Sequence, residues 1–272
     1  MSGGAMTIER LRAILVYSKS HSKDISEDIA IFCNQIGVSN LDGIRNLLQI
    51  VRPYLLQRKY LTIQLPLHDD EIGAFVYKGD SLSYLVINTS MPVLNTNFAL
   101  CHELYHIFFP ADEALNKARI DLDYYSNENE MRANEFAGNL LMPEIEFKQM
   151  FSKLKAIHEN KSKTELKIIV SLMNYFKAPF MAVYIRCYEL GLLSSTPQYL
   201  DIEPETIKNE FEELWLDTTD LHALKIDNSE YLIKHVEDKG REYLEKEYIN
   251  ERTLKKALEN IKILISKVKA RK

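Results

Sequence analysis

The sequence contains little cysteine, and its few thiols are not arranged for cross-linking. The three cysteines among 272 residues are Cys33, Cys101 and Cys187, which are odd in number, widely spaced and never part of a CxxC pair. This pattern excludes a disulfide framework and is typical of a protein in a reducing compartment. We therefore expect a cytoplasmic protein.

Long apolar runs, a targeting segment and internal repeats are absent too. No window approaches the roughly 18 uninterrupted apolar residues of a membrane-spanning helix, so no membrane partner is expected. The N-terminus lacks the charged, apolar and small residues that mark a signal peptide, and residues 1–6 are expected to be a cloning remnant or a disordered start. These absences predict a soluble chain, and its 272 residues suggest one large domain, or one domain and a smaller appendage.

The chain as a whole also lacks excess positive charge. Its 34 Lys and Arg residues against 39 Asp and Glu give a net charge of −5, which argues against a protein devoted to wrapping nucleic acid. Residues 251–272 are basic, however, with eight Lys or Arg against two Glu. One stripe of this expected helix is apolar, namely Leu254, Leu258, Ile261, Ile265 and Val268. We expect docking or dimerisation through 251–272, and no nucleic-acid partner.

What the sequence does contain is 46% hydrophobic residues, enough for a substantial core, in two kinds of pattern. Apolar residues at helical spacing predict helices at 7–17, 25–36, 41–51, from 96 onward, 129–142, 162–177 and 180–190. Pro53 is expected to end the third of these. Alternation in 61–66 and 73–88, with KGDS as a turn, predicts a small antiparallel β-sheet. The fold class is therefore α+β and mainly helical.

A change of composition at 194–205 (SSTPQYLDIEPE) indicates a linker. We predict a domain at 7–195 and a helical C-terminal extension at 196–272. The helices at 162–177 and 180–190 have the outline of a helix-turn-helix, but the second offers few basic residues, which favours core packing. Five histidines are expected at the surface: His21, His68, His158, His222 and His235.

Residues 98–110 (FALCHELYHIFFP) place two histidines four residues apart in a strongly apolar stretch. Positions i and i+4 of a helix share one face, about 6 Å apart, so His102 and His106 can direct two imidazoles at one point. Zinc, with nitrogen ligands at roughly 2.0–2.1 Å, suits that point, and Glu103 can act as general base toward a water there. A satisfied pair of core histidines is the alternative, but H-E-x-x-H on a helix favours a metallopeptidase site.

A catalytic zinc site needs a third protein ligand, and the next amphipathic helix offers one. Glu130 can supply it, while Asn134, one turn further on, can hydrogen-bond a ligating histidine. The other carboxylates in this region are Asp121 and Asp123, in an expected loop, Glu128, near the frayed helix start, and Glu135, pointing about 100° away from Asn134. Spacing alone leaves the choice among these acids open.

HELYH followed by ENEMRANEFAGNLLMP resembles the ImmA/IrrE family of zinc metallopeptidases, in which a HExxH helix precedes a helix of the form E-x-x-A-N-x-F-A…L-L-M-P. The likeness covers roughly residues 25–195 and implies a zincin-like metallopeptidase domain. It also implies that Zn²⁺ is held by His102, His106 and Glu130, with Glu103 as the base.

The resemblance further implies a regulatory protease that cleaves a helix-turn-helix repressor or an antitoxin-type transcription regulator encoded nearby. The alternative is a non-proteolytic, metal-containing stress or transcription regulator that acts by binding a partner or DNA. The chain departs from the family at Tyr105, where glycine is usual, and at Asn97, where arginine or lysine is common. Since every ligand position and the base Glu103 match, we expect an active enzyme.

Overall fold

The computed structural model describes residues 6–39, 46–78, 83–110, 128–159, 162–194 and 196–269. The expectations for residues 1–5, for a helix start at residue 41 and for the turn at 79–81 lie outside these ranges. Within them the fold is α+β and mainly helical, as the sequence patterns predict.

The N-terminal region forms two helices where the sequence suggested three. Helix α1 (Ile8–Gln35) is continuous, because neither proline nor glycine interrupts it between the two expected segments. Helix α2 (Leu47–Gln57) runs through Pro53, so the prediction that this proline ends the helix is wrong. Val51 and Leu55, on either side of it, are both fully buried. Burying two such side chains is worth about 3–6 kcal/mol, which offsets the roughly 3 kcal/mol that an interior proline costs.

A small mixed sheet follows, in the spatial order β1-β3-β2. Strands β2 (Ala74–Tyr77) and β3 (Ser83–Asn88) form the expected antiparallel hairpin, but β1 (Tyr60–Leu65) pairs with β3 in parallel, which corrects the prediction of an antiparallel sheet. The reason lies in the connection from β1 to β2, which carries the chain to the far edge. The buried Asn88 side chain holds this connection, donating to Asp69 O and Ile72 O at 2.7 Å each.

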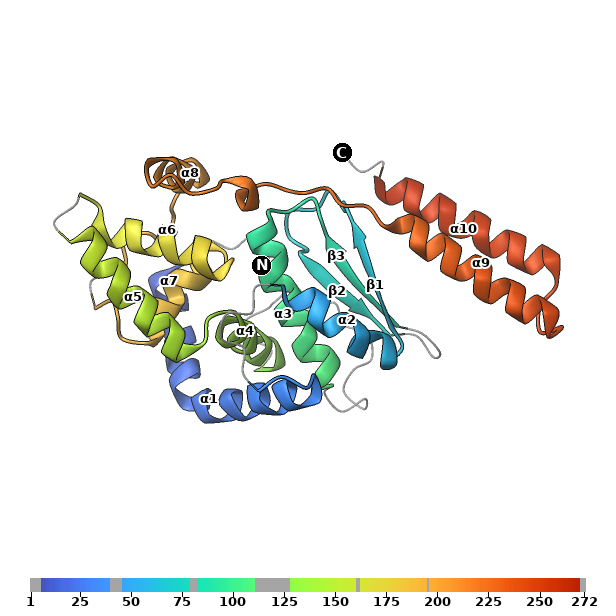
Figure 1. Cartoon of the computed structure of the whole chain (residues 1–272), viewed down its shortest axis with the longest axis horizontal. Coiled ribbons are helices and arrows are strands. Elements are labelled where there is room, and N and C mark those ends of the chain that lie inside the picture. Colours follow the sequence, from blue (N-terminus) through green and yellow to red (C-terminus); the bar gives the residue numbers. More distant parts are fainter. Residues whose placement is uncertain are drawn as a thin grey trace.

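Helices α3 (Val93–Phe108) and α4 (Glu128–Leu141) pack against each other at the centre of the molecule, with the sheet on one side of α3 and α1 against α4 (Figure 1). Phe32 of α1 marks the meeting point of the three helices. Its ring lies edge-on to Phe108 at 4.7 Å and to Phe136 at 5.5 Å, centroid to centroid. The two elements predicted to carry the metal ligands are therefore fixed to each other by a shared aromatic core.

A second group of helices follows α4 in the chain. They are α5 (Glu144–His158), α6 (Thr164–Phe176), α7 (Phe180–Glu189), α8 (Pro204–Glu213) and the short 3₁₀ helix η1 (Thr219–Leu221). Through its helix α7, this group packs on α4 and on α1. Val183, Tyr184 and Cys187 of α7 are fully buried, so the core-packing prediction for this helix-turn-helix outline is confirmed. His158 is also buried, at the end of α5 near Ser171, and the expectation that it lies at the surface is wrong.

Cys33, Cys101 and Cys187 are free and buried, and burial raises the pKa of each thiol. No single helix in the described ranges is long and apolar enough to cross a membrane. Helices α6 and α7 reach that length and composition only as a pair bent by 110°.

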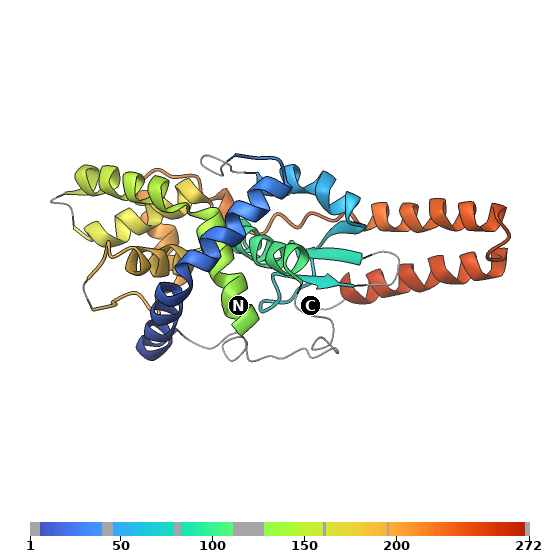
Figure 2. The same ribbon diagram turned by 90° about the horizontal axis from the view of Figure 1, so that it is seen from below.

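The C-terminal helices α9 (Ser229–Glu245) and α10 (Glu251–Lys269) form a hairpin that projects from the body beside β1 (Figures 1 and 2). Asn228 fastens its base to β1 because its backbone N–H donates to Gln64 O at 3.0 Å and its Oδ1 accepts from Gln64 N at 2.7 Å. Helix α10 packs along α9, and Leu254 of α10 lies directly on Gly240 of α9.

Candidate metal centre

Helices α3 and α4 bring three predicted ligands to one point. The Nε2 atoms of His102 and His106 lie 3.2 Å apart. Glu130 faces both, with Oε2 at 3.0 Å from His102 Nε2 and Oε1 at 3.3 Å from His106 Nε2. Helical spacing explains the histidine pair, and the packing of α4 on α3 explains the glutamate.

This donor set fits a zinc ion. Ligands bound tetrahedrally at roughly 2.0–2.2 Å stand about 3.3–3.6 Å from one another. The observed separations of 3.0–3.3 Å require shifts of only a few tenths of an ångström. Two imidazoles and one carboxylate are also a known catalytic zinc set, which leaves the fourth position open for water or substrate.

Amide side chains hold the outer nitrogens of both imidazoles. Asn134 Oδ1 lies 3.0 Å from His102 Nδ1, which confirms the predicted contact of this asparagine with a ligating histidine. Asn129 Nδ2 lies 3.3 Å from His106 Nδ1. Sequence reasoning missed Asn129, although its place beside Glu130 in the first turn of α4 was the available signal. With Nδ1–H donating to Asn134, a neutral His102 turns its Nε2 lone pair toward the cluster, as a metal ligand requires.

The electrostatics of the cluster favour bound positive charge. Burial opposes the charged form of His102, yet the hydrogen bond that this imidazole donates to Glu130 and the negative charges of Glu103 and Glu130 raise its pKa. Burial likewise opposes the carboxylate of Glu130, but the hydrogen bonds and charges of the two imidazoles lower its pKa. Either a protonated imidazole or a metal cation can supply the positive charge that these carboxylates favour, and the geometry of the donor atoms suits the cation.

Glu103 lies beside the three ligands on the strand side of α3. Burial raises the pKa of its carboxyl group and the negative charge of Glu130 adds to the effect, while the two imidazoles oppose it. The backbone N–H of Val76, in β2, donates a hydrogen bond to the Glu103 carboxylate. The helix therefore presents Glu103 between the ligand cluster and the edge strand of the sheet.

The other carboxylates that sequence spacing left open lie elsewhere or outside the described ranges. The Glu128 side chain is 82% exposed and lies 3.9 Å from His21. Glu135 is buried on another side of α4, where burial and the neighbouring Glu189 raise its pKa. Asp121 and Asp123 fall in the segment 111–127, which the structure does not describe. Among these acids, and within the described residues, Glu130 is the one that contacts both histidines.

The two departures from the family pattern have structural roles of their own. Tyr105 is buried with its ring stacked on Phe109 at 5.3 Å, tilted against Phe136 at 5.6 Å and edge-on to His106 at 5.7 Å. It therefore fills the seam between α3 and α4 and helps to hold His106. Asn97 Nδ2 donates to Lys177 O at 3.1 Å, which ties α3 to the end of α6.

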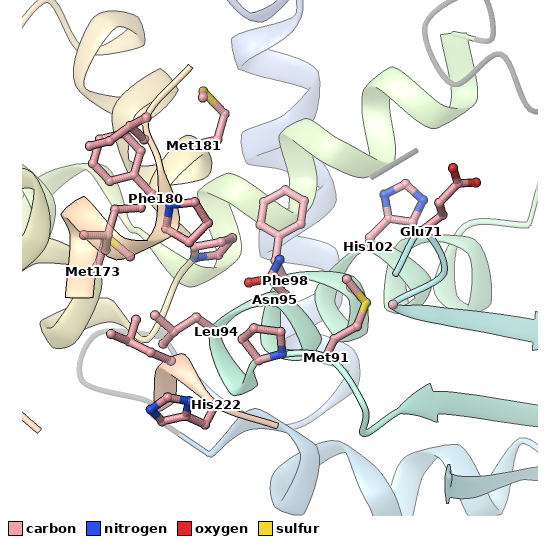
Figure 3. A pocket seen from close by; sticks show the side chains of 18 of the residues that line it. Glu71, Met91, Leu94, Asn95, Phe98, His102, Met173, Phe180, Met181 and His222 are labelled. Carbon is pink, nitrogen blue, oxygen red and sulfur yellow. The ribbon is translucent and has the colours of Figure 1, made fainter. Parts of the chain in front are cut away.

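A cavity of about 570 Å³ opens beside the ligand cluster, with His102 and Glu103 among the residues that line it. Figure 3 shows His102 and Glu71 at one end and Met173, Phe180 and Met181 at the other. A cavity of this size is typical of ligand-binding clefts, which measure roughly 300–1,000 Å³. The cluster thus lies at the wall of a substrate-sized space.

Comparison with known proteins agrees with this geometry. Residues 57–188 match the family model described as Peptidase_M78, IrrE N-terminal-like domain. No curated protein and no solved structure matches the chain significantly. The matched range contains the sheet, α3 and α4, hence all three candidate ligands and Glu103, and it ends in α7 before the segment that leads to α8.

Proposed function

The domain at residues 57–188 belongs to the Peptidase_M78 family of metallopeptidases, as the resemblance to ImmA/IrrE predicted, and on that premise we propose that the chain is a zinc-dependent endopeptidase. The convergence of His102, His106 and Glu130 within hydrogen-bonding distance of one another is the observation that carries this proposal. A regulator that only binds metal has no use for Glu103, which is an ionisable group kept at the cluster at the expense of burial.

In this proposal each residue of the centre has one task. His102 Nε2, His106 Nε2 and Glu130 would hold zinc, which supplies Lewis acidity and lowers the pKa of its water toward about 7. Glu103 accepts the proton of the attacking water at its carboxylate and returns it to the leaving amine. A raised carboxyl pKa suits both transfers, because it brings the base closer to the working pH. The Val76 N–H holds the carboxylate in place.

We propose further that the substrate adds to the sheet as an extended strand along β2. This strand forms an edge of the sheet. Gly73 O accepts from Asn88 N in β3, so the backbone groups of Gly73 face the sheet. Backbone direction alternates along a strand, and the N–H and C=O groups of Ala74 and Val76 therefore point away from β3. On that side the Val76 N–H meets Glu103. Ala74→Pro removes one outward N–H and should weaken peptide cleavage about tenfold. Unchanged cleavage would refute strand addition.

For the substrate we propose a helix-turn-helix repressor or antitoxin-type regulator encoded near the gene, an assignment supported by the family alone. The test incubates the zinc-loaded protein with that regulator and maps fragments by mass spectrometry. Glu103→Gln should remove about 10²–10⁴-fold of the activity while zinc binding persists, because it deletes only the base. Glu27→Gln, at an exposed glutamate of α1, is the matched control.

The alternative is a metal-containing stress or transcription regulator that acts by binding a partner or DNA. Stable complexes without fragments, from parent and Glu103→Gln alike, would favour it. The partner surface that we propose at 251–272 can be tested with a chain that ends at residue 228, which keeps the contacts of Asn228 with β1. Loss of regulator binding with intact peptide cleavage would assign docking to the α9–α10 hairpin.

A further inference from the structure

The cavity beside the ligand cluster is apolar over most of its wall. Phe98 of α3, Met173 of α6, and Phe180 and Met181 of α7 line it away from the metal centre (Figure 3). Among the charged residues of the wall, Glu71 lies at the His102 end (Figure 3), and Lys208 Nζ lies 3.5 Å from Glu205 Oε1, so these two opposite charges pair with each other. Burying a charged ligand group against such a wall is costly, whereas an apolar group gains from the same burial.

Part of this wall comes from outside the matched family range. Ile202, Ile207 and Leu221 line the cavity from the segment that carries α8 and η1. This segment is firmly anchored, because Phe211 is 1% exposed and the fully buried Glu210 pairs with Lys163 at 2.6 Å. The outer wall is therefore a fixed part of the cavity.

The position of the cavity relative to β2 indicates which part of a bound peptide would lie next to the cavity. Gly73 lies directly against Ala99, since a Cβ added at Gly73 would stand 2.7 Å from Ala99 Cβ. Val76 lies at Glu103, so β2 and α3 run in the same direction past each other. The cavity is at the Gly73 and Ala99 end. A substrate antiparallel to β2, the more stable pairing, passes Glu103 first and this end afterwards.

We propose that this cavity binds a bulky apolar side chain immediately on the carboxyl-terminal side of the cleaved bond, and that residues 202–222 form its specificity-determining outer wall. This inference rests on the proposed peptidase function, because it refers to a cleaved bond. Binding at the cavity can nevertheless be measured without cleavage. It names a substrate class for the centre, namely peptides with Leu, Met or Phe after the cut.

The first experiment measures binding alone, in the zinc-loaded Glu103→Gln chain. The probes are short synthetic peptides, identical except for Ala, Leu, Phe, Asp or Lys at the position after the cut, which a peptide library digested by the parent protein defines. If the parent cuts none, the same five residues are placed at each successive position of peptides from the regulator encoded nearby. The Phe and Leu peptides should bind about 10- to 100-fold more tightly than the Ala peptide, and Asp and Lys peptides no better than Ala.

The second experiment tests the outer wall. Ile207→Trp fills the cavity from α8 and should weaken binding of the Phe peptide at least about tenfold while leaving the Ala peptide nearly unchanged. Leu221→Trp, in η1, should do the same, and a second position guards against one variant that fails to fold. Ile157→Trp, at a residue of α5 that is 59% exposed, is the control and should change neither affinity. Far-ultraviolet circular dichroism checks the fold of each.

The outcomes separate the two proposals. Equal binding of the Phe and Ala peptides overturns the inference, whether or not the parent chain cleaves them. Discrimination that survives both tryptophan variants refutes residues 202–222 as the wall. Discrimination without any cleavage by the parent supports the cavity and overturns the peptidase function. Cleavage without a preference for apolar residues supports the peptidase function and overturns the proposed apolar pocket.

Discussion

Replacement of Asn134 by alanine should weaken zinc binding by about 10- to 100-fold. Asn134 Oδ1 lies 3.0 Å from His102 Nδ1, and His102 is only 7% exposed, so water has little access to replace the lost acceptor. A hydrogen bond to a metal-bound imidazole both orients the ring and raises its basicity. The expected loss in binding free energy is about 1.4–2.8 kcal/mol, the value of one to two factors of ten.

A matched control lies on the same helix. Asn139 Nδ2 donates to Glu135 O within α4 at 2.9 Å, so Asn139→Ala removes an asparagine without touching a ligand. Asn134→Asp restores an acceptor at the same place and should bind zinc at least as well as the parent chain, because a carboxylate orients the histidine in the same way.

Zinc affinity is measured by competition with a chromophoric chelator at fixed pH, and thermal melting of the metal-free proteins shows that each variant folds. The expected order is Asn134→Asp at or above the parent, Asn139→Ala equal to it and Asn134→Ala below. Equal affinities for the two alanine variants would refute the role that we assign to Asn134.

Three further predictions concern stability. Tyr105→Gly, which restores the usual family residue, should cost about 3–5 kcal/mol in urea denaturation because it empties the seam between α3 and α4, whereas Tyr105→Phe should cost under about 1 kcal/mol. Burial and a neighbouring carboxylate raise the pKa of Glu135, so the protonated form is favoured on folding. Stability should then fall by up to about 1.4 kcal/mol per pH unit as pH rises from 4.5 toward the raised pKa of about 9, a slope that Glu135→Gln should abolish in unfolding measured at several pH values. Gly240→Ala places a Cβ 2.1 Å from Leu254 Cδ1 and should speed proteolysis of the α9–α10 hairpin. Gly138→Ala, with nothing within 4 Å, should instead stabilise the protein by about 0.5–1 kcal/mol in urea.

The helical pairs of the candidate site could be predicted from sequence because helical geometry is local. His102 and His106 share a face by their spacing alone, and so do Glu130 and Asn134. Spacing left open which acid would meet the histidines, because that depends on how α4 lies on α3. The family pattern supplied that choice, and the observed contacts of Glu130 with both imidazoles agree with it.

The sheet shows where local patterns stop. Alternation predicted the strands, and the turn predicted the hairpin, but the direction of β1 depends on the path between strands. That path is stabilised by the Asn88 side chain, which binds the backbone at Asp69 and Ile72 and accepts from Leu67 N at 3.0 Å. Such long-range capping of a loop by one buried amide has no periodic signature. The prediction that Pro53 ends its helix was wrong for a related reason, since burial of the neighbouring Val51 and Leu55 outweighs the tendency of proline to break a helix.

The segment 196–222 illustrates why a compositional linker need not be a structural one. The serine, threonine and proline content of residues 194–205 suggested a boundary there, yet Tyr199, Leu200 and Ile202 pack on the main core, and Phe211 belongs to it. A linker that exposes its backbone to water carries no such anchors. Because the same segment walls the cavity beside His102, part of the cavity wall lies outside the residues that match the family model. Within such a family the chemistry can stay constant while the accepted substrate changes, since ligands and wall belong to separate parts of the chain.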